Sequence, residues 1–373
     1  MGSPAVKTVS TLEGFDALAP EWDGLVAAMA RPSPFFLQGW LRALWPLCDE
    51  PRICVARQDG HLVGALPLDV RRRSGVRVAE FIGGGNSHLA DLLIAPDAGG
   101  DVATALLDEA RRSSFDFADL FGMPAGSRIA QAAGLRLLER VEAPVLDLDR
   151  DWEAVYASKT STKTRQTNRR KLRRLGELGR LEFSLAVEPD DVGSALDETF
   201  RIHELRWRGR ADGSGLRRPE VRAAQRAAYR SLAGIARILT LSIDGRAIAY
   251  NCVLVVANRL YSHRLAFDPA YAQWSPGLAC TLEICERAAA EGIERVEFLG
   301  GGEEYKLQLA DRLEPLYEGF GLAQTARGRA AVTGRLGLVA ARRRLKRFRR
   351  LHRLYVEGLA PARRAIASVY TSR

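Results

Sequence analysis

The chain has 373 residues, of which 47% are hydrophobic and 27% are charged, a balance typical of a globular protein long enough for two domains. No stretch approaches the roughly 20 uncharged apolar residues that a membrane span needs, and the first 25 residues lack the basic start and apolar core of a secretory signal. The five cysteines include no CxxC pair, so we expect reduced thiols in a cytoplasmic protein and no metal site.

The net charge of +10 is unevenly distributed along the chain. Residues 327–373 contain fourteen Lys/Arg and one acid, whereas the rest of the chain has 41 basic and 44 acidic residues. The excess positive charge therefore lies in a C-terminal tail, and any binding of polyanions by net charge is expected there.

The first half begins with two helical stretches and then changes to strand patterns. Residues 51–72 predict a hairpin of two short strands around an Asp-Gly turn. A strand (88–96), a helix (102–112) and a second strand (115–122) are expected to follow. This order is typical of a mixed α/β unit.

The second half repeats the same order. A hairpin around another Asp-Gly turn (236–259) precedes a strand (259–269), a helix (277–292) and a strand (293–300), and the two Asp-Gly turns lie 185 residues apart. This repetition predicts a duplicated unit. We expect an N-terminal unit at 1–148, a C-terminal unit at 149–326 and a basic amphipathic tail at 327–373, with helices flanking the mixed sheets.

A turn marked by Pro276 and Gly277 separates the predicted strand 259–269 from the helix that follows. The first amides of a helix lack partners within the helix and can hold a phosphate. The candidate phosphate contacts in this turn are Gln273, Trp274, Ser275, Gly277, Leu278 and Ala279. An ordinary helix start capped by Ser275 is the alternative.

The segment after the last strand combines three glycines with ionisable side chains. Glu303 and Glu304 could accept a proton from an amine, Tyr305 could donate one to a leaving group, and Lys306 could pair with an anion. A solvated loop with a surface ion pair is the alternative. His263, in a predicted strand, and His203, on a predicted helix, rank beside Glu304 as candidate bases.

Four segments resemble the GNAT acyltransferases, and more narrowly their FemAB-like, BioF2-like branch, in which two such units are fused. They are PSPFFLQGWLRALW (32–45), KTSTKTRQTNRRKLRRLGELG (159–179), HELRW (203–207) and FLGGGEEYK (298–306). The resemblance covers roughly residues 10–325. It implies N-acyl transfer from acetyl-CoA, or another acyl-CoA, to an amino sugar or another small amine in exopolysaccharide or cell-envelope synthesis.

The resemblance also implies roles for particular residues. Backbone amides of residues 260–267 would polarise the thioester carbonyl, and residues 275–279 would hold the pyrophosphate of coenzyme A. The first half would have lost donor binding and would shape the acceptor site. The expected acceptor contacts are Glu303, Lys306, Arg206 and Trp207 from the second half and Asp91, with Asn86 and His88, from the first.

Two other functions stay open at this stage. One is an aminoacyl-tRNA-dependent transferase of the Fem kind, which the basic segment 159–180 would suit. The other is a non-catalytic regulatory protein of the same fold that binds a nucleotide.

The tail predicts a basic amphipathic helix, and its arginines include Arg342, Arg343, Arg344, Arg347 and Arg350. Such a helix suits an anionic membrane on its cytoplasmic face or cyclic di-GMP, since arginine both stacks on bases and binds phosphate. A solvated tail is the alternative, and no DNA partner is expected.

Overall fold

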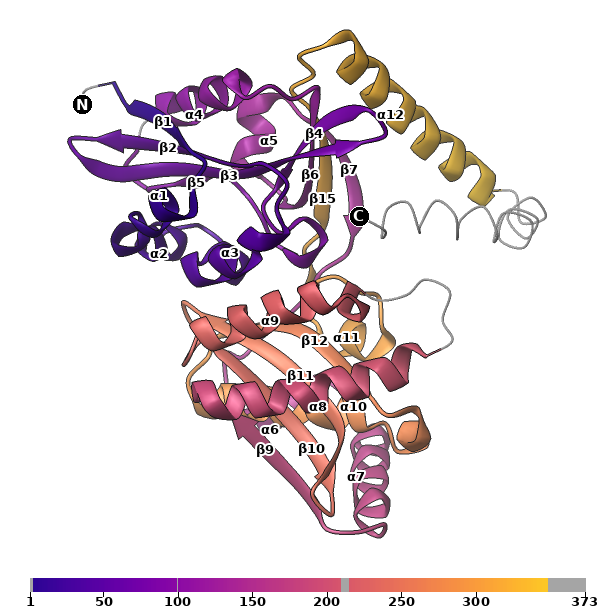
Figure 1. The fold of residues 1–373 in the computed structure, drawn as a ribbon. Coiled ribbons are helices and arrows are strands. Elements are labelled where there is room, and N and C mark those ends of the chain that lie inside the picture. The colour runs from indigo at the N-terminus through magenta and orange to yellow at the C-terminus, as the bar shows by residue number, and fades with distance from the viewer. Residues whose placement is uncertain (1–2, 99, 209–214, 348–373) are drawn as a thin grey trace.

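The computed structural model describes residues 3–98, 100–208 and 215–347, and it shows two α/β units with helices on the faces of their sheets (Figure 1). An eight-stranded mixed sheet forms the N-terminal unit and a seven-stranded mixed sheet forms the C-terminal unit. Helix α12 (Ala326–Arg347) leaves the N-terminal unit (Figure 1). This arrangement confirms the predicted class of two mixed α/β units followed by a basic helix.

The first sheet has the strand order β1-β2-β3-β4-β6-β15-β7, with β5 paired to β3. Its strands are β1 (Ala5–Val9), β2 (Pro51–Gln58), β3 (His61–Arg73), β4 (Val76–Phe81), β5 (Leu93–Ile94), β6 (Phe117–Pro124), β7 (Arg136–Val141) and β15 (Leu316–Gly321). The helices of this unit are α1 (Leu12–Asp16), α2 (Ala19–Ala27), η1 (Pro34–Phe36), α3 (Gln38–Leu44), η2 (Trp45–Leu47), η3 (Gly84–Asn86), α4 (Gly100–Arg112) and α5 (Arg128–Ala133).

The second sheet has the order β14-β8-β13-β12-β11-β10-β9. Its strands are β8 (Pro144–Asp147), β9 (Leu181–Ala186), β10 (Ala236–Ile243), β11 (Arg246–Val256), β12 (Arg259–Phe267), β13 (Arg295–Glu297) and β14 (Arg312–Leu313). The helices of this unit are α6 (Trp152–Lys159), α7 (Thr162–Gly176), α8 (Pro189–Trp207), η4 (Gly215–Arg217), α9 (Pro219–Ser231), η5 (Pro269–Trp274), α10 (Pro276–Ala290) and α11 (Glu304–Leu309).

The two sheets exchange one strand each. β15, from the end of the second half of the chain, pairs with both β6 and β7 in the first sheet. β8, from the end of the first half, pairs with both β13 and β14 in the second sheet. Each unit is therefore completed by a strand that the chain supplies from the other half.

The repeated order is visible in both sheets. The hairpin turns Asp59-Gly60 and Asp244-Gly245 have positive φ at both residues, the conformation that two-residue Asp-Gly hairpins favour, so both predicted hairpins are confirmed. β4 pairs in parallel with β6 just as β12 does with β13.

β4 was not predicted, and the predicted strand 88–96 contains only the two residues of β5. The pattern VRVAEF contains two charged residues, but in the fold Glu80 is buried and pairs with Arg73 at 2.7 Å. The charge of Glu80 therefore made β4 look unlike a strand in the sequence, although Glu80 pairs with Arg73 on the neighbouring strand and most other side chains of β4 are apolar.

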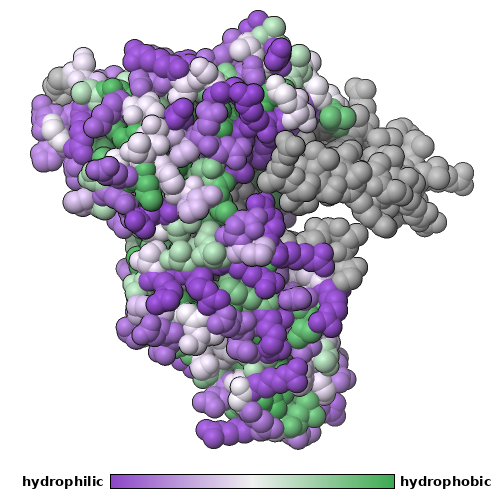
Figure 2. All heavy atoms as spheres, in the orientation of Figure 1, coloured by the Kyte–Doolittle hydropathy of each residue, from purple (hydrophilic) through white to green (hydrophobic). Residues whose placement is uncertain are grey.

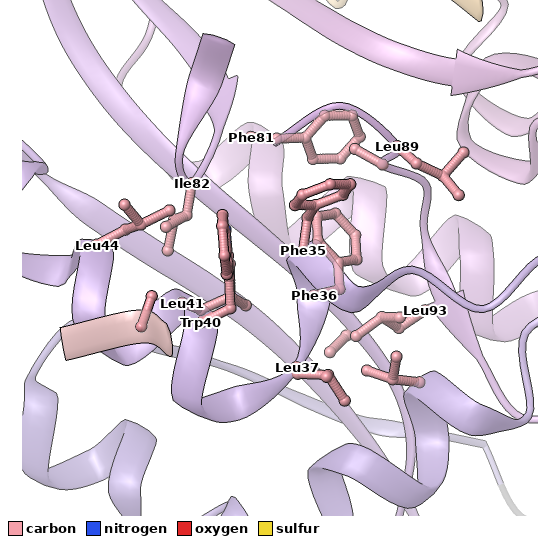
Figure 3. Close-up of a cluster of buried hydrophobic side chains, with 14 of the residues drawn as sticks. Phe35, Phe36, Leu37, Trp40, Leu41, Leu44, Phe81, Ile82, Leu89 and Leu93 are labelled. Atoms are coloured by element: carbon pink, nitrogen blue, oxygen red, sulfur yellow. The ribbon is translucent and has the colours of Figure 1, made fainter. Parts of the chain in front are cut away.

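Helices cover both faces of the second sheet. α8 and α9 share a core with the N-terminal unit, in which Trp40 packs near Tyr229. The close-up of this core shows Phe35, Phe36 and Trp40 among buried aliphatic side chains (Figure 3). On the opposite face, α6, α7 and α10 contribute to a separate core through Val155, Leu175 and Ile284. The two faces of the sheet therefore have different surroundings.

The first turns of α12 dock on the N-terminal unit. Ala331, Val332 and Leu336 pack against the buried side chains Val78, Phe117 and Phe320. Arg335 lies 3.4 Å from Glu318 and 3.8 Å from Asp119. The part of the tail nearest the body is thus held by apolar and ionic contacts.

On the face shown in Figure 2, hydrophilic residues cover much of both units, and hydrophobic residues occur in smaller groups between them. None of the helices in the described part of the chain is both long and apolar enough to cross a membrane.

Candidate active site

The sheet of the C-terminal unit opens where β12 and β13 part. The two strands pair in parallel only through residues 259–261 and 295–297. β12 continues along β11 as far as Phe267, while the chain leaves β13 through residues 298–300. The β12 edge from Ser262 onward therefore faces a gap where it pairs with no strand of the described chain.

A β-bulge lies at the start of this gap. Cys252 of β11 pairs with Arg264, whereas the next residue, Val253, pairs with Ser262. His263 is thus the extra residue on β12. A bulge bends a strand and re-aims its side chains, and such bulges are common beside active sites.

Two cavities, each of about 280 Å³, lie at the gap. The first, the α8-side cavity, is lined by His88, His203, Arg206, Trp207, residues 262–267, residues 298–300, Glu303, Tyr305 and Lys306. The second, the α10-side cavity, is lined by Leu265, Phe267, Ala272, Ser275, Gly277, Leu278, Glu304 and Tyr305. They share Leu265, Phe267 and Tyr305, so they meet at the end of β12.

His263 is held deep in the wall of the α8-side cavity. Its Nδ1 lies 2.8 Å from the Tyr229 hydroxyl, and its ring lies 5.3 Å from Phe35 and 5.2 Å from Trp40. Its Nε2 is buried without a hydrogen-bond partner among the described residues. Burial, reinforced by the charge of Arg264, lowers the pKa of His263 well below 6.5, so the imidazole is neutral at pH 7.

Two further histidines line the same cavity. Nδ1 of His203 lies 3.0 Å from the Tyr250 hydroxyl, and its ring stacks on Trp207. The ring of His88, from the N-terminal unit, lies 5.4 Å from that of His263. Burial, with nearby cations second, lowers the pKa of both His203 and His88 to about 4. All three imidazoles are therefore neutral at pH 7, and each is a weaker base than a solvent-exposed histidine.

Cations predominate among the other ionisable groups of the α8-side cavity. The Arg206 guanidinium lies 4.8 Å from the centre of the Phe267 ring, and Arg264 also lines the wall. Lys306 is only 8% exposed and pairs with the exposed carboxylate of Glu303 at 3.1 Å. Three cations against one carboxylate give the cavity a positive potential.

Tyr305 lies on α11 between the two cavities. Burial, followed by the charge of Glu303, raises the pKa of its phenol well above the usual value near 10, so the hydroxyl keeps its proton at neutral pH. Its neighbour Glu304 is exposed and lines the α10-side cavity, away from the three histidines. The structure therefore separates Glu304 from His203 and His263, the other two candidate bases.

The turn before α10 presents free amides. Ser275 has the left-handed φ of 56°, and its side chain makes no capping hydrogen bond to the helix; its hydroxyl accepts from Lys171 instead, at 2.9 Å. Pro276 has no N–H, and the first helical bond in this turn runs from Ala279 N to Ser275 O. The amides of Gly277 and Leu278 come before that bond and so have no acceptor within the helix. The alternative, a helix start capped by the Ser275 side chain, is not what the structure shows.

Only some of the predicted phosphate contacts lie together. Ser275, Gly277 and Leu278 line the α10-side cavity, Trp274 and Ala279 line a third cavity beside α7, and Gln273 lines none of these three.

Gly277 has a packing role that the sequence did not indicate. A Cβ at this position would lie 2.9 Å from Leu265 Cδ2 and 3.1 Å from Phe267 Cδ1. The glycine therefore lets α10 approach β12 closely, whatever ligand binds at the turn.

Asp91 does not line the α8-side cavity. It is buried and accepts hydrogen bonds from Ser127 Oγ at 2.7 Å and from the backbone N–H groups of Arg128 and Ile129 at the start of α5. It lines a cavity of about 520 Å³ at the junction of the units, apart from the three histidines. Its observed role is to cap a helix.

In the N-terminal unit the corresponding gap is filled by the protein itself. Ala90 N donates to Gly122 O at 3.0 Å, and a Cβ on Gly122 would lie 3.1 Å from His88 O. The segment around His88 thus occupies the space beside β6 and carries His88 into the α8-side cavity.

The predicted tail arginines are only partly described. The backbone of Arg342, Arg343, Arg344 and Arg347 belongs to α12, and Arg350 lies outside the described residues. The described part of the chain contains no group of three or more His, Cys, Asp or Glu residues that could hold a metal ion.

Sequence reasoning missed Arg264 and Tyr229. Arg264 directly follows His263 in a strand, where consecutive side chains normally point to opposite faces, and only the bulge brings both to one cavity. Tyr229 lies on α9, at a position whose sequence pattern is typical of a buried core residue. Neither carried a signal in the sequence alone.

Comparison with known families gives one match. Residues 162–307, from the start of α7 into α11, match the acetyltransferase (GNAT) domain. The match contains the parted strands, the α10 turn and Tyr305, and it supports a transferase. A search of curated proteins finds no match.

Solved structures show the same two-unit fold. FemX superposes with a TM-score of 0.60 at 10% identity, over 84% of this chain and 96% of FemX. The C-terminal domain of a protein assigned as a lysylphosphatidylglycerol synthetase from Agrobacterium fabrum gives 0.56 at 15%, over 86% and 95%. L-PGS from Bacillus licheniformis gives 0.52 at 13%, over 80% and 91%. The predicted tandem GNAT fold is thereby confirmed.

Proposed function

We propose that this chain transfers an acyl group, most simply acetyl, from coenzyme A to an amine. The observation that carries the proposal is the meeting of two cavities at the gap between β12 and β13. A thioester held in the α10-side cavity would present its carbonyl at Leu265, Phe267 and Tyr305. An amine in the α8-side cavity would approach the same point from the other side.

The exposed edge of β12 supplies the electrostatic part of this chemistry. When the amine nitrogen attacks the thioester carbon, the carbonyl oxygen becomes an oxyanion, and backbone N–H groups along residues 262–267 can donate to it. Preorganised donors of this kind commonly contribute about 2.7–4 kcal/mol each. The amides of Gly277 and Leu278 can hold the pyrophosphate of the donor.

Two proton transfers complete the reaction. The cations of the α8-side cavity lower the pKa of a bound ammonium group, so the acceptor arrives as the free amine. A neutral imidazole, His203 or His263, takes the proton that the nitrogen loses after attack. The C–S bond then breaks, and the Tyr305 hydroxyl protonates the departing thiolate.

The acceptor that fits best is an amine that also carries negative charge. Arg206, Arg264 and Lys306 would pair with a phosphate or carboxylate on it. We keep an amino sugar of exopolysaccharide or envelope synthesis as the proposed acceptor, on the FemAB-like and BioF2-like resemblance. The name of one structural neighbour, lysylphosphatidylglycerol synthetase, also points to an envelope component as a product of this fold.

An aminoacyl-tRNA donor is the second candidate, and α7 favours it. Lys163, Arg169, Arg170, Arg173 and Arg174 are exposed on this helix, and Lys171 links it to the α10 turn. A tRNA donor predicts binding that weakens steeply with salt, whereas binding of acetyl-CoA should change much less.

Calorimetric titration of acetyl-CoA into the full chain tests the donor. We expect micromolar binding that Ala272→Trp abolishes, because Ala272 is exposed and lines the α10-side cavity. The matched control is Gln273→Trp, since Gln273 is also exposed but lines none of the three cavities around the turn. No binding by the folded wild-type protein, or equal loss in both variants, would refute the acetyl-CoA proposal.

For the tail we propose peripheral binding to an anionic inner membrane surface or to cyclic di-GMP, in a cytoplasmic protein. Its support is the charge of residues 327–373. Co-sedimentation with phosphatidylglycerol vesicles and titration with cyclic di-GMP would test both, each with the full chain and with residues 1–337, which keep the docked Leu336 but lack the five tail arginines named above. Binding unchanged by the truncation would contradict the proposal.

A further inference from the structure

The cavity of about 520 Å³ at the junction of the two units, called here the junction cavity, takes no part in the proposed reaction. It is lined from the N-terminal unit by segments within residues 29–31, 89–94 and 124–128, and from the second half of the chain by Arg259, Arg295 and residues 313–315. None of its lining residues lines the α8-side or the α10-side cavity. It is therefore a separate space that a second ligand can occupy.

The internal duplication makes the α8-side cavity a counterpart of the junction cavity. The chain between β6 and α5 lines the junction cavity, as the chain between β13 and α11 lines the α8-side cavity. Beside β6, however, the segment around His88 fills the gap that stays open beside β12. The junction cavity thus has the place of a ligand site in its unit without the opening that a thioester needs.

Arginines from both units line the junction cavity. Arg31 and Arg128 belong to the N-terminal unit, and Arg259 and Arg295 are the first residues of β12 and β13. Of the two carboxylates in the wall, that of Asp91 accepts hydrogen bonds from one hydroxyl and three backbone N–H groups. Asp91 is therefore already fully used within the N-terminal unit.

The carboxylates that do contact these arginines are shared between two of them. Glu297 is fully buried and lies 2.6 Å from Arg31 Nη2 and 3.2 Å from Arg259 Nη1. The same sharing occurs at Glu314, between Arg31 and Arg312, and at Asp147, between Arg295 and Arg312. No carboxylate of this network is paired with one arginine alone.

The sharing leaves guanidinium donors unused. Arg128 is exposed, donates to the Ile94 carbonyl at 3.2 Å and forms no ion pair within the described part of the chain. Nε of Arg31 is buried and has no hydrogen-bond partner among the described residues. The five arginines at 31, 128, 259, 295 and 312 face four carboxylates, at 91, 147, 297 and 314. This excess of positive charge favours an anion, and guanidinium groups bind phosphate through paired N–H donors.

Much of the remaining wall is apolar. Leu89, Leu92 and Ile94 are buried there, and Met29 and Leu313 also line the cavity. Its volume lies in the range that small-molecule ligands fill. An anion that carries an apolar part therefore suits the cavity better than a bare ion.

We propose that the junction cavity binds a phosphate monoester with an apolar body, and that this ligand is not consumed. Its phosphate would lie between Arg31 and Arg128, and its apolar part would pack against Leu89 and Leu92. Because the arginines come from both units, the ligand would hold the units together beside the first residues of β12 and β13. The inference concerns a second site and does not depend on the proposed function.

Calorimetric titration of the full chain with phenyl phosphate, inorganic phosphate and phenol tests the two parts of the ligand separately. We expect phenyl phosphate to bind about tenfold more tightly than inorganic phosphate, because its ring buries apolar surface. Phenol should not bind measurably. Arg128→Gln should weaken phenyl phosphate about tenfold by removing a charge-assisted bond.

Arg136→Gln is the matched control, because Arg136 is also an exposed arginine of the N-terminal unit and does not line the cavity. Ala125→Trp is a second test: Ala125 is exposed and lines the cavity, so the indole should block phenyl phosphate. All three variants should unfold at the wild-type denaturant concentration in the absence of ligand. Equal weakening by Arg128→Gln and Arg136→Gln would mean a general charge effect and would overturn the site.

The phosphate monoester can be free in solution or can be the head group of a lipid. Binding to phosphatidic acid vesicles that falls in Arg128→Gln but not in Arg136→Gln would assign the lipid source and keep the site. Displacement of phenyl phosphate by acetyl-CoA would place the phosphate in the donor site and overturn the inference. So would the absence of both phenyl phosphate binding and Arg128-dependent vesicle binding. Loss of acetyl-CoA binding alone would refute only the proposed function.

Discussion

Tyr305 is the side chain on which the proposed reaction depends most directly, since it lines both cavities and keeps its proton. Tyr305→Phe should lower kcat by about 10²-fold, the range of a lost general acid, with KM for acetyl-CoA nearly unchanged. Steady-state kinetics would measure both constants.

A thioester whose thiol is more acidic should reduce this defect, because its thiolate needs no proton. The control is Tyr317→Phe, which removes a phenol that lines neither cavity. Full kcat in Tyr305→Phe would mean that the thiolate takes its proton from another group.

The buried histidines should make the protein less stable in acid. His203 has a folded-state pKa of about 4 against 6.5 in the unfolded chain. Between these values the unfolded state binds more protons. The stabilisation is therefore full above pH 6.5 and is lost as the pH falls toward 4, by up to about 1.4 kcal/mol per pH unit for each such histidine.

Denaturant unfolding between pH 7 and 4 would measure this loss, and His203→Gln isolates one histidine because the carboxylates are common to both proteins. The free energy of unfolding of the variant should fall less steeply with acid. Parallel curves would show that His203 takes up its proton as readily in the folded as in the unfolded protein.

At the scale of residues, the structure brings some of the predicted site residues into one cavity and places others elsewhere. Tyr305, Lys306, Arg206 and Trp207 line one cavity, as the FLGGGEEYK and HELRW segments suggested. Asp91 caps a helix instead. The sequence could not show this, because a carboxylate that caps a buried helix and one that binds a ligand look alike in a single sequence.

At the scale of elements, the contact between α10 and β12 makes Gly277 a packing residue. Gly277→Ala should lower the free energy of unfolding by about 1–3 kcal/mol, because the new methyl group meets Leu265 and Phe267. Gly193→Ala on α8 is the control: its nearest neighbour atom is 4.0 Å away, and alanine there should stabilise by about 0.5–1 kcal/mol.

Thermal and denaturant unfolding of both variants would compare them. Unchanged stability of Gly277→Ala, with a large loss of coenzyme A affinity, would instead support the predicted role of the glycine in phosphate approach.

Elements with strong local signals could be predicted from the sequence. The two Asp-Gly hairpins and the start of α10 depend on turn residues whose conformations are local. β8, β14 and β15 could not be placed, because short strands take their partners from distant parts of the chain. For the same reason the bulge at His263, which only pairing reveals, went unseen.

At the scale of the whole molecule, the strand exchange should make the halves interdependent. Residues 1–148 lack β15, which buries Phe320 and separates β6 from β7; residues 149–373 lack β8. Expressed alone, each half should aggregate or stay unfolded because two strand edges are exposed. Expressed together, they should co-purify as one folded complex.

Size-exclusion chromatography and circular dichroism of the three preparations would decide this. A monomeric fragment 1–148 with a cooperative unfolding transition would contradict it.

The exchange of β8 and β15 between the two sheets also delays folding of the first sheet during synthesis. β6 ends at Pro124, but its partner β15 is complete only at Gly321, 197 residues later. At about 5–20 residues per second, the ribosome needs roughly 10–40 s to supply it. During that interval the nascent first sheet has a gap between β6 and its end strand β7. A chain that terminates before β15 would keep that gap even if it contained all of β12 and β13. Its unpaired strand edges would then be exposed to chaperones and proteases.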